Sequence, residues 1–147
     1  MVIAVEQALR SGEMSITGRL VDASNATLLA TVADGGEGIA CIYKPIAGER
    51  PLWDFPHGTL AYREYAAYLV SSVGNFDVVP FTVLRDGPYG EGAVQQWIEI
   101  DQEIDLLNFF QRDEPGLRTM ALFDAIINNT DRKIGHLLPT SDGRIQG

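Results

Sequence analysis

The segments IACIYKP (residues 39–45) and LAYREYAAYLVSSV (residues 60–73) decide the fold of this 147-residue chain. The first is short, apolar and closed by a proline, which is typical of a strand that ends there. The second has apolar residues at helical spacing between Thr59, which can cap a helix, and Gly74, which we expect to end it in a left-handed conformation. A strand followed by a long helix is therefore predicted.

Further strands are predicted on both sides of this pair. Residues 14–21 and 26–33 are rich in β-branched and apolar residues, and a polar turn at residues 22–25 separates them. After the helix, residues 76–86 and 91–100 read as two more extended segments around a turn that contains glycine and proline. These patterns predict a sheet of about five antiparallel strands.

Helices dominate the rest of the chain. A short helix is predicted at LLNFFQR (residues 106–112), and a longer one begins near Pro115, because proline is tolerated in a first helical turn. The composition changes from strand-like to helical near residues 99–105, without a linker or a repeat. We therefore expect an α+β fold with a sheet and one long helix in residues 1–99, followed by helices in residues 100–147.

The composition excludes several classes of protein. Twenty acidic residues against eleven basic ones give a net charge of −9, which opposes binding to nucleic acid or to anionic lipid. No apolar run reaches the length of about 20 residues that a transmembrane helix needs. The single Cys41 cannot form an intrachain disulfide and reads as a small buried residue of a strand. These observations predict a cytoplasmic protein without a transmembrane segment.

Lys44 and Glu64 are the first candidates for chemistry. Alternation along the predicted strand places Lys44 on the same face as Ile42. Glu64 lies within or beside the stripe that the predicted helix forms with Ala61, Tyr65, Tyr68 and Ser72. Taken alone, Lys44 is better explained as a strand-end lysine whose ammonium reaches solvent, and Glu64 could be a solvated residue at the edge of the helix. Together, a strand lysine and an inward helix glutamate about twenty residues later match the ion pair that positions ATP phosphates in kinases.

The segment INNTDRKIGHLL (residues 127–138) is the most specific signal in the sequence. Asp131 and the two cations after it come directly after a predicted amphipathic helix. The carboxylate can accept a proton from a hydroxyl group, while Arg132 and Lys133 would hold phosphates or a structural carboxylate. A polar loop that ends the helix is the alternative interpretation, because Asn and Asp favour turns.

Three further polar residues flank this segment or lie within it. Asn129 would present an amide oxygen, and His136 an imidazole nitrogen, to a bound cation or nucleotide. Asp124 lies on the predicted inward face of the preceding helix, where an unpaired carboxylate would be costly. We expect Asp124 either to brace the loop or to be a partly exposed helix acid.

Asp131-Arg132-Lys133, with Asn129 two residues earlier, resembles the catalytic loop of phosphatidylinositol 3- and 4-kinases, HipA-type kinases and related secretory-pathway kinases. Their common pattern is N-x-D-R-H. The stretches VDASNATLL, YKPIAGERPLWDFPHGTLAYREYAAYLV and ALFDAIINNTDRKIGHLLPT together resemble an actinobacterial protein family related to the phosphatidylinositol kinases. This likeness covers nearly the whole chain from about Ile16 onward.

The resemblance implies a kinase-like fold and a role for individual residues. Residues 1–99 would form the nucleotide-binding lobe, and residues 100–147 the hinge and the start of the C-terminal lobe, with ATP and Mg²⁺ as cofactors. The implied nucleotide-binding residues are Ser24 and Asn25 of the phosphate loop, Ile42, Lys44 with its partner Glu64, and Asn129. The implied catalytic residues are Asp131 as the base, Arg132 and Lys133.

The sequence departs from the family pattern in its metal-binding residues. Lys133 stands where these kinases usually have histidine, and His136 stands where many have a metal-ligating asparagine. His136 is the predicted metal ligand, although imidazole is softer than the oxygens that Mg²⁺ prefers. The family's second ligand, in an Asp-x-Gly motif, is expected just after the hairpin LLPTSDGRIQG, which ends at Gly147.

The predicted function is therefore ATP-dependent phosphoryl transfer in the complete protein. The hydroxyl acceptor would be a protein, a lipid or a small molecule, and this chain is expected to be an inactive fragment that self-associates. A pseudokinase-like module that binds a nucleotide or a partner is the alternative, which His136 and the missing motif favour. Trp97, near the predicted hinge, is expected to be a core residue rather than a platform for adenine.

Overall fold

The computed structural model describes residues 2–20, 27–48, 60–99, 115–127, 129, 138–139 and 145–146. Two compact units are present, one formed by Met1–Ala66 with Phe81–Trp97 and the other by Ala67–Pro80 with Ile98–Gly147. The fold is α+β, as predicted. The predicted domain boundary between residues 99 and 100 stays a prediction.

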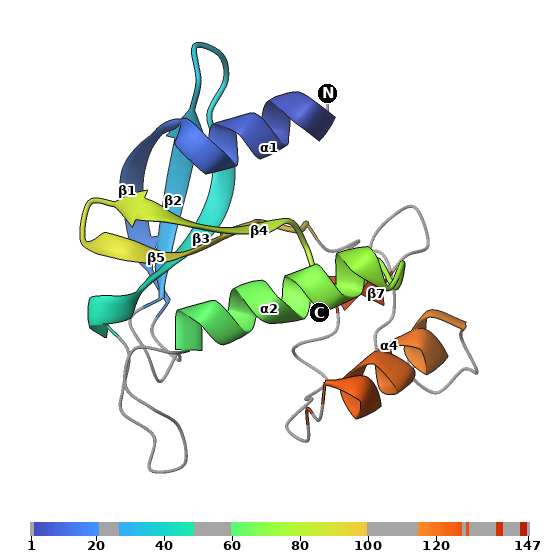
Figure 1. Ribbon diagram of the computed structural model, residues 1–147. Coiled ribbons are helices and arrows are strands. Elements are labelled where there is room, and N and C mark those ends of the chain that lie inside the picture. The colour runs from blue at the N-terminus through green and yellow to red at the C-terminus, as the bar shows by residue number, and fades with distance from the viewer. Residues whose placement is uncertain are drawn as a thin grey trace. The chain divides into compact units, whose positions relative to one another are not determined.

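The first unit is built on a five-stranded antiparallel sheet with the strand order β1-β2-β3-β5-β4 (Figure 1). The strands are β1 (Glu13–Arg19), β2 (Leu28–Ala33), β3 (Ile39–Pro45), β4 (Thr82–Gly87) and β5 (Gly90–Gln96), and a short 3-10 helix, η1 (Ile46–Gly48), follows β3. The predicted number of five strands is confirmed, but the strand predicted at residues 76–86 begins only at Thr82, and the one predicted at residues 91–100 ends at Gln96. Strand β3 is central, because β2 pairs with one of its edges and β5 with the other.

Helix α1 (Val2–Ser11), dark blue in Figure 1, packs against this sheet and was not predicted from the sequence. Leu9 is fully buried, and its carbonyl oxygen accepts a hydrogen bond of 3.1 Å from Nη1 of Arg85 in β4. The guanidinium carbon of Arg10 lies 5.1 Å from the centre of the Phe81 ring, which is a cation–π distance. Contacts with residues far along the chain thus hold this helix.

The two faces of the sheet differ in burial. Cys41 and Tyr43 alternate with Ile42 and Lys44 along β3. Cys41 and Tyr43 are buried on the face where Arg85 reaches α1, whereas Ile42 and Lys44 are only half-buried. We define the Tyr43 face by Cys41, Tyr43, Val83 and Val94, and the Lys44 face by Ile42, Lys44, Ala93 and Gln95.

Helix α2 (Leu60–Val73) has the predicted bounds, but it ends differently from the prediction. The left-handed residue is Asn75, with φ of 59°, and not Gly74. Backbone hydrogen bonds from Asn75 to Ser72 and from Phe76 to Ser71 close a Schellman motif around Asn75. Gly74 is needed for space instead, because a Cβ there would lie 2.6 Å from the Phe76 ring.

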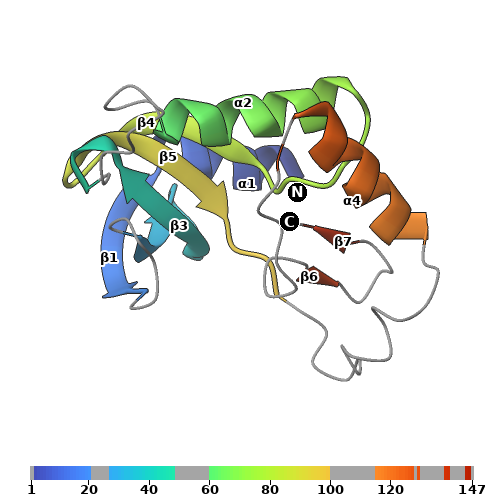
Figure 2. The same ribbon diagram turned by 90° about the horizontal axis from the view of Figure 1, so that it is seen from below.

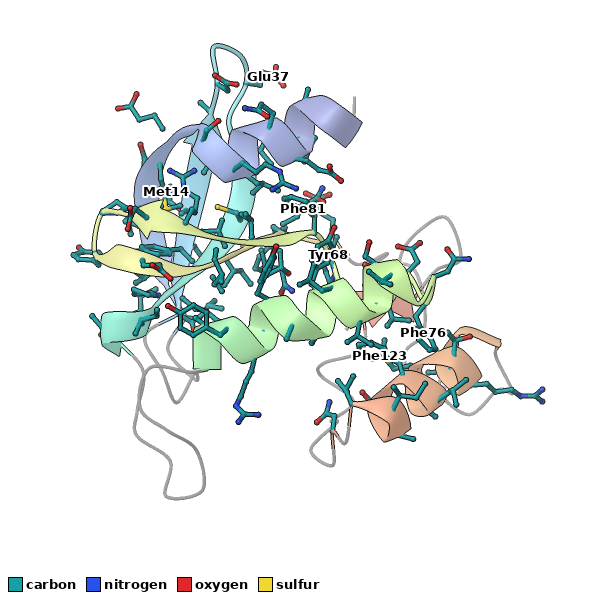
Figure 3. All side chains as sticks on the ribbon, in the orientation of Figure 1. Met14, Glu37, Tyr68, Phe76, Phe81 and Phe123 are labelled. Atoms are coloured by element: carbon teal, nitrogen blue, oxygen red, sulfur yellow. The ribbon has the colours of Figure 1, made fainter. Side chains whose placement is uncertain are left out.

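The second unit has a small core of its own. Helix α4 (Pro115–Ile126) starts at the predicted proline, and the rings of Phe76 and Phe123 pack edge to face at 5.5 Å between their centres (Figure 3). The core residues are Val78, Val79, Met120 and Phe123. The paired strands β6 (Leu138–Pro139) and β7 (Ile145–Gln146) confirm the predicted hairpin (Figure 2).

A buried serine organises the chain that follows α2. The hydroxyl oxygen of Ser71 accepts hydrogen bonds from the backbone N–H groups of Val78, at 2.9 Å, and Val79, at 3.1 Å. Ser72 was predicted to lie on the inward stripe, but Ser72 is exposed and Ser71 is buried. Helical spacing alone does not tell which of the two neighbouring serines is buried. The contacts of Ser71 with Val78 and Val79 decide it.

The helices bear on two predictions, the absence of a transmembrane segment and the self-association of the chain. No helix among the described residues is long and apolar enough to cross a membrane. In the second unit, several large apolar side chains are exposed: Leu69, Val70, Val73, Leu122 and Ile126. The predicted self-association of the chain stays a prediction.

Candidate functional site

Lys44 and Glu64 form the predicted ion pair. Nζ of Lys44 lies 2.8 Å from Oε1 of Glu64, and the two side chains are 33% and 41% exposed. Exposed pairs of this kind stabilise a fold by only about 0.2–1 kcal/mol, because water screens the charges and two long side chains lose freedom. The pair therefore contributes little to stability, and its role in binding a nucleotide stays a prediction.

A glycine that the sequence analysis missed positions the backbone of Lys44. In the register of β3 and β5, Lys44 lies opposite Ala93, and Pro45 lies opposite Gly92. A Cβ on Gly92 would lie 2.4 Å from the carbonyl oxygen of Lys44 and 2.7 Å from Cα of Pro45. Only glycine permits this approach. A lone glycine inside a predicted strand is the signal that could have identified it.

A second contact helps to hold the start of α2 on the Lys44 face. The hydroxyl of Tyr62 donates a hydrogen bond of 2.8 Å to Oε1 of Glu91. Glu91 lies two residues before Ala93 in β5 and therefore on the same face. Ala61, beside Tyr62 in the helix, is buried. Two polar contacts on one helix thus set the position of Glu64 relative to β3.

The Lys44 face continues from Lys44 into a partly buried polar pair. Ile42, the predicted nucleotide-binding residue two positions before Lys44, lies opposite Gln95. Nε2 of Gln95 donates a hydrogen bond of 2.9 Å to Oγ1 of Thr82, which is buried on the neighbouring strand β4. Neither residue of this pair was among the predicted site residues.

Trp97 lies just beyond the end of β5, and its prediction as a core residue was wrong. Its backbone N–H donates to the carbonyl oxygen of Ala40 at 3.1 Å, so the register of β3 and β5 extends by one residue. Alternation then places Trp97 on the Lys44 face, two residues after Gln95. The side chain is 40% exposed. A tryptophan at the end of a strand has fewer neighbours than one inside the sheet, which explains the exposure.

Asn129 and Asp124 are linked in the second unit. Nδ2 of Asn129 donates to Oδ1 of Asp124 at 3.2 Å, and the backbone N–H of Asn129 donates to the carbonyl oxygen of Asp124 at 2.8 Å. Asp124 is only 8% exposed, so the alternative of a partly exposed helix acid was wrong. That Asp124 braces a catalytic loop stays a prediction.

Several predicted site residues lie outside the described part of the chain. They are Ser24, Asn25, Asp131, Arg132, Lys133 and His136. The hydrogen bond of 2.9 Å from Leu20 N to Thr27 O brackets the segment that contains the first two. Among the described residues, no three His, Cys, Asp or Glu side chains come together as metal ligands. Lys44 and Asn129 belong to different units.

The buried groups of the Tyr43 face are structural. Sγ of Cys41 lies 3.6 Å from the carbonyl oxygen of Ala30, and burial raises the pKa of its thiol to about 11, although the charge of Arg85 opposes this shift. The prediction of a small buried residue is confirmed. Burial likewise raises the pKa of Tyr43, whose hydroxyl donates to Gly90 O and accepts from the backbone N–H of Tyr89.

Comparison with known proteins identifies a relative, but the name of that relative indicates no activity. No family model matches the sequence. The chain is 41% identical to Protein Rv2133c of Mycobacterium tuberculosis over 174 aligned positions, which cover 95% of this chain and 63% of that protein. The chain thus spans less than two thirds of the length of this relative. The relative comes from an actinobacterium, and the predicted relationship to kinases stays a prediction.

Proposed function

We propose that this chain binds the phosphates of ATP at the Lys44 face of its sheet, and that the complete protein transfers a phosphoryl group. The ion pair between Lys44 and Glu64 is the observation that supports this function best. A kinase needs a strand lysine that is held by a helix carboxylate and still reaches solvent. Lys44 meets both conditions, because its amino group is paired and its side chain is one third exposed.

The small energetic value of the pair also supports a role in binding. An ion pair that contributes only about 0.2–1 kcal/mol to folding has little structural purpose. Gly92, Tyr62 and Glu91 nevertheless hold the strand and the helix so that the two charges meet. A fixed ammonium group with remaining donor capacity suits the oxygens of a phosphate, which are acceptors.

Mg²⁺ would neutralise the nucleotide phosphates when bound. The described residues contain no cluster of His, Cys, Asp and Glu ligands for it, so we assign the ion no ligand set among them. His136 stays the predicted metal ligand, and it lies outside the described residues. The part of the reaction that the described residues support is the binding and orientation of the nucleotide by Lys44.

The binding proposal is tested by titrating the 147-residue chain with ATP and Mg²⁺ in a calorimeter. Lys44→Ala should weaken ATP binding about tenfold or more, because a charge-assisted phosphate contact is lost. Arg63→Ala is the matched control, since Arg63 is an exposed cation beside Glu64 in α2. Equal affinity of the wild type and Lys44→Ala would contradict the proposal.

A charge exchange separates a binding lysine from a structural pair. The double variant Lys44→Glu with Glu64→Lys keeps opposite charges at the two positions but moves the cation from β3 to α2. We expect its unfolding free energy to stay close to that of the wild type, while ATP affinity stays as low as in Lys44→Ala. Recovery of ATP affinity in the double variant would show that the position of the cation does not matter.

Transfer itself is tested in the complete protein. Asp131→Asn keeps the size and hydrogen bonding of the side chain but cannot accept the hydroxyl proton. It should abolish phosphoryl transfer and spare ATP binding, whereas Lys44→Ala should weaken both. A complete protein that binds ATP without any turnover would favour the pseudokinase-like alternative.

A further inference from the structure

The turn between β2 and β3 contains an aspartate that is followed directly by two glycines. Asp34, Gly35 and Gly36 come after the last residue of β2, and all three are exposed. The turn projects from the end of the sheet, where Figure 3 labels Glu37. Within the described part of the chain, the side chain of Asp34 forms no hydrogen bond or ion pair. No described residue therefore holds its carboxyl group in place.

The backbone of this turn is equally open. Gly35 has a φ of 75°, in the left-handed region that glycine adopts without strain. A Cβ at Gly35 or at Gly36 would meet no atom within 4 Å. None of the backbone hydrogen bonds outside the helices and strands of the described residues involves this turn. Because few contacts hold it, the amide nitrogen of Gly35 is free to turn toward the side chain of Asp34.

We infer that Asp34 converts slowly to isoaspartate, so that this turn is a site of spontaneous backbone modification. The amide nitrogen of Gly35 attacks the side-chain carboxyl carbon of Asp34. A new C–N bond forms, one water molecule leaves, and the product is a five-membered succinimide ring. Water then adds to one of the two ring carbonyl carbons, and the bond from that carbon to nitrogen breaks. Opening at the main-chain carbonyl gives isoaspartate, and the cycle needs no reactant other than water.

A second Asp-Gly pair, Asp86-Gly87, has the same chemistry but is held in place. Asp86 is also exposed, so exposure does not distinguish the two pairs. The backbone does, because Asp86 pairs with Glu91 and Gly87 pairs with Gly90 in the ladder of β4 and β5. A Cβ at Gly87 would lie 2.7 Å from the Tyr43 ring, so this ring packs directly against the backbone. The structure therefore separates two sites that the sequence presents alike.

The modification leaves the proposed binding site unchanged. Isoaspartate lengthens the main chain of the turn by one methylene group, next to Ile39 at the start of β3. Lys44 lies five residues further along β3, at a distance of roughly 17 Å in extended chain. The inference is thus independent of the proposed function, since a chain that binds no nucleotide would be modified at the same residue.

The test incubates the folded 147-residue chain for several weeks at physiological temperature and pH, in water enriched in heavy oxygen. Ring opening incorporates one heavy oxygen atom, and fragmentation in a mass spectrometer distinguishes aspartate from isoaspartate at each site. Asp34 should isomerise at least about tenfold faster than Asp86, because ladder hydrogen bonds must break before a ring can close at Asp86. A third pair, Asp142-Gly143, lies outside the described residues.

The same chain unfolded in guanidinium chloride is the matched control, because it keeps both Asp-Gly sequences and removes the structure that separates them. Asp34 and Asp86 should then isomerise at similar rates. Equal rates in the folded chain, or no isoaspartate at Asp34, would overturn the inference. A difference that persists in the unfolded chain would assign the effect to neighbouring residues in the sequence and would overturn the inference as well.

Discussion

The two faces of strand β3 differ in what surrounds them, although their residues alternate along one strand. On the Tyr43 face, Cys41 and Tyr43 are buried where the sheet meets α1, and their polar atoms bond within the first unit. On the Lys44 face, Ile42 is half-buried, and Lys44 holds a partly exposed ion pair with Glu64.

The Tyr43 face therefore contributes mainly to stability, and the Lys44 face is the one proposed to bind a ligand. Burial of apolar surface is the main favourable term in folding, and it is concentrated on the Tyr43 face. The Lys44 face holds groups that contribute little to stability and have donors or acceptors to offer, such as Lys44 and Gln95. Substitutions on the two faces should therefore affect different measurements.

The largest effect is expected from Tyr43→Ala. Tyr43 is fully buried, and its removal leaves a cavity and two backbone groups, at Tyr89 and Gly90, without their partner. The free energy of unfolding should fall by about 3–5 kcal/mol in chemical denaturation. A loss no greater than that caused by Lys44→Ala would remove the distinction between the two faces.

A smaller effect on the free energy of unfolding is expected from the ionisation of the Cys41 thiol at alkaline pH. Its thiol has an ordinary pKa of 9.0 and a folded-state pKa of about 11. Between these values the folded state keeps a proton that the unfolded state has lost, so stability falls as pH rises through this window, by about 2 kcal/mol. Cys41→Ala should show a shallower decline in unfolding free energy from pH 9 to 11. Identical slopes would contradict the assignment, since other groups titrate equally in both proteins.

Gly92→Ala should destabilise the chain by about 1–3 kcal/mol, because the new methyl group would displace the backbone of Lys44 and Pro45. It should also weaken ATP binding by shifting Lys44. Gly36→Ala is the matched control, since a Cβ there meets no atom within 4 Å. Equal thermal stability of the two variants would show that β3 and β5 can separate at little cost.

The smallest effect on stability is expected from Lys44→Met. Methionine keeps most of the apolar stem and removes the charge, so the unfolding free energy should change by less than about 1 kcal/mol. ATP affinity measured on the same samples should nevertheless fall as strongly as in Lys44→Ala. A variant that unfolds much more easily would make the ion pair a structural element of the fold.

Strand β3 and helix α2, which have clear local sequence patterns, were predicted correctly. Both have their predicted bounds, because a proline ends the first and helical spacing extends through the second. Helix α1 was missed, since ten residues are too few to form a stable helix without tertiary packing. The end of α2 was predicted at the right place but with the wrong left-handed residue, because the Phe76 ring needs the space beside Gly74.

The candidate site shows the same division. Strand alternation and helical spacing placed Lys44 and Glu64 on inward faces, the match to the kinase ion pair suggested that they meet, and the contact is present. The close approach at Gly92 and the hydrogen bond between Gln95 and Thr82 were not visible, since both depend on a neighbouring strand. The predicted roles of Asp131 and the residues around it lie outside the described part of the chain.

The sequence by itself determined the order of the five strands, the bounds of β3 and α2, and the faces on which Lys44 and Glu64 lie, because these follow from periodicity along one segment. Only the tertiary structure decided which face of β3 is enclosed, that Ser71 rather than Ser72 is buried, and that Trp97 is exposed. Burial is set by residues that are distant in the chain, such as those of α1 over the sheet, and no local pattern contains their positions.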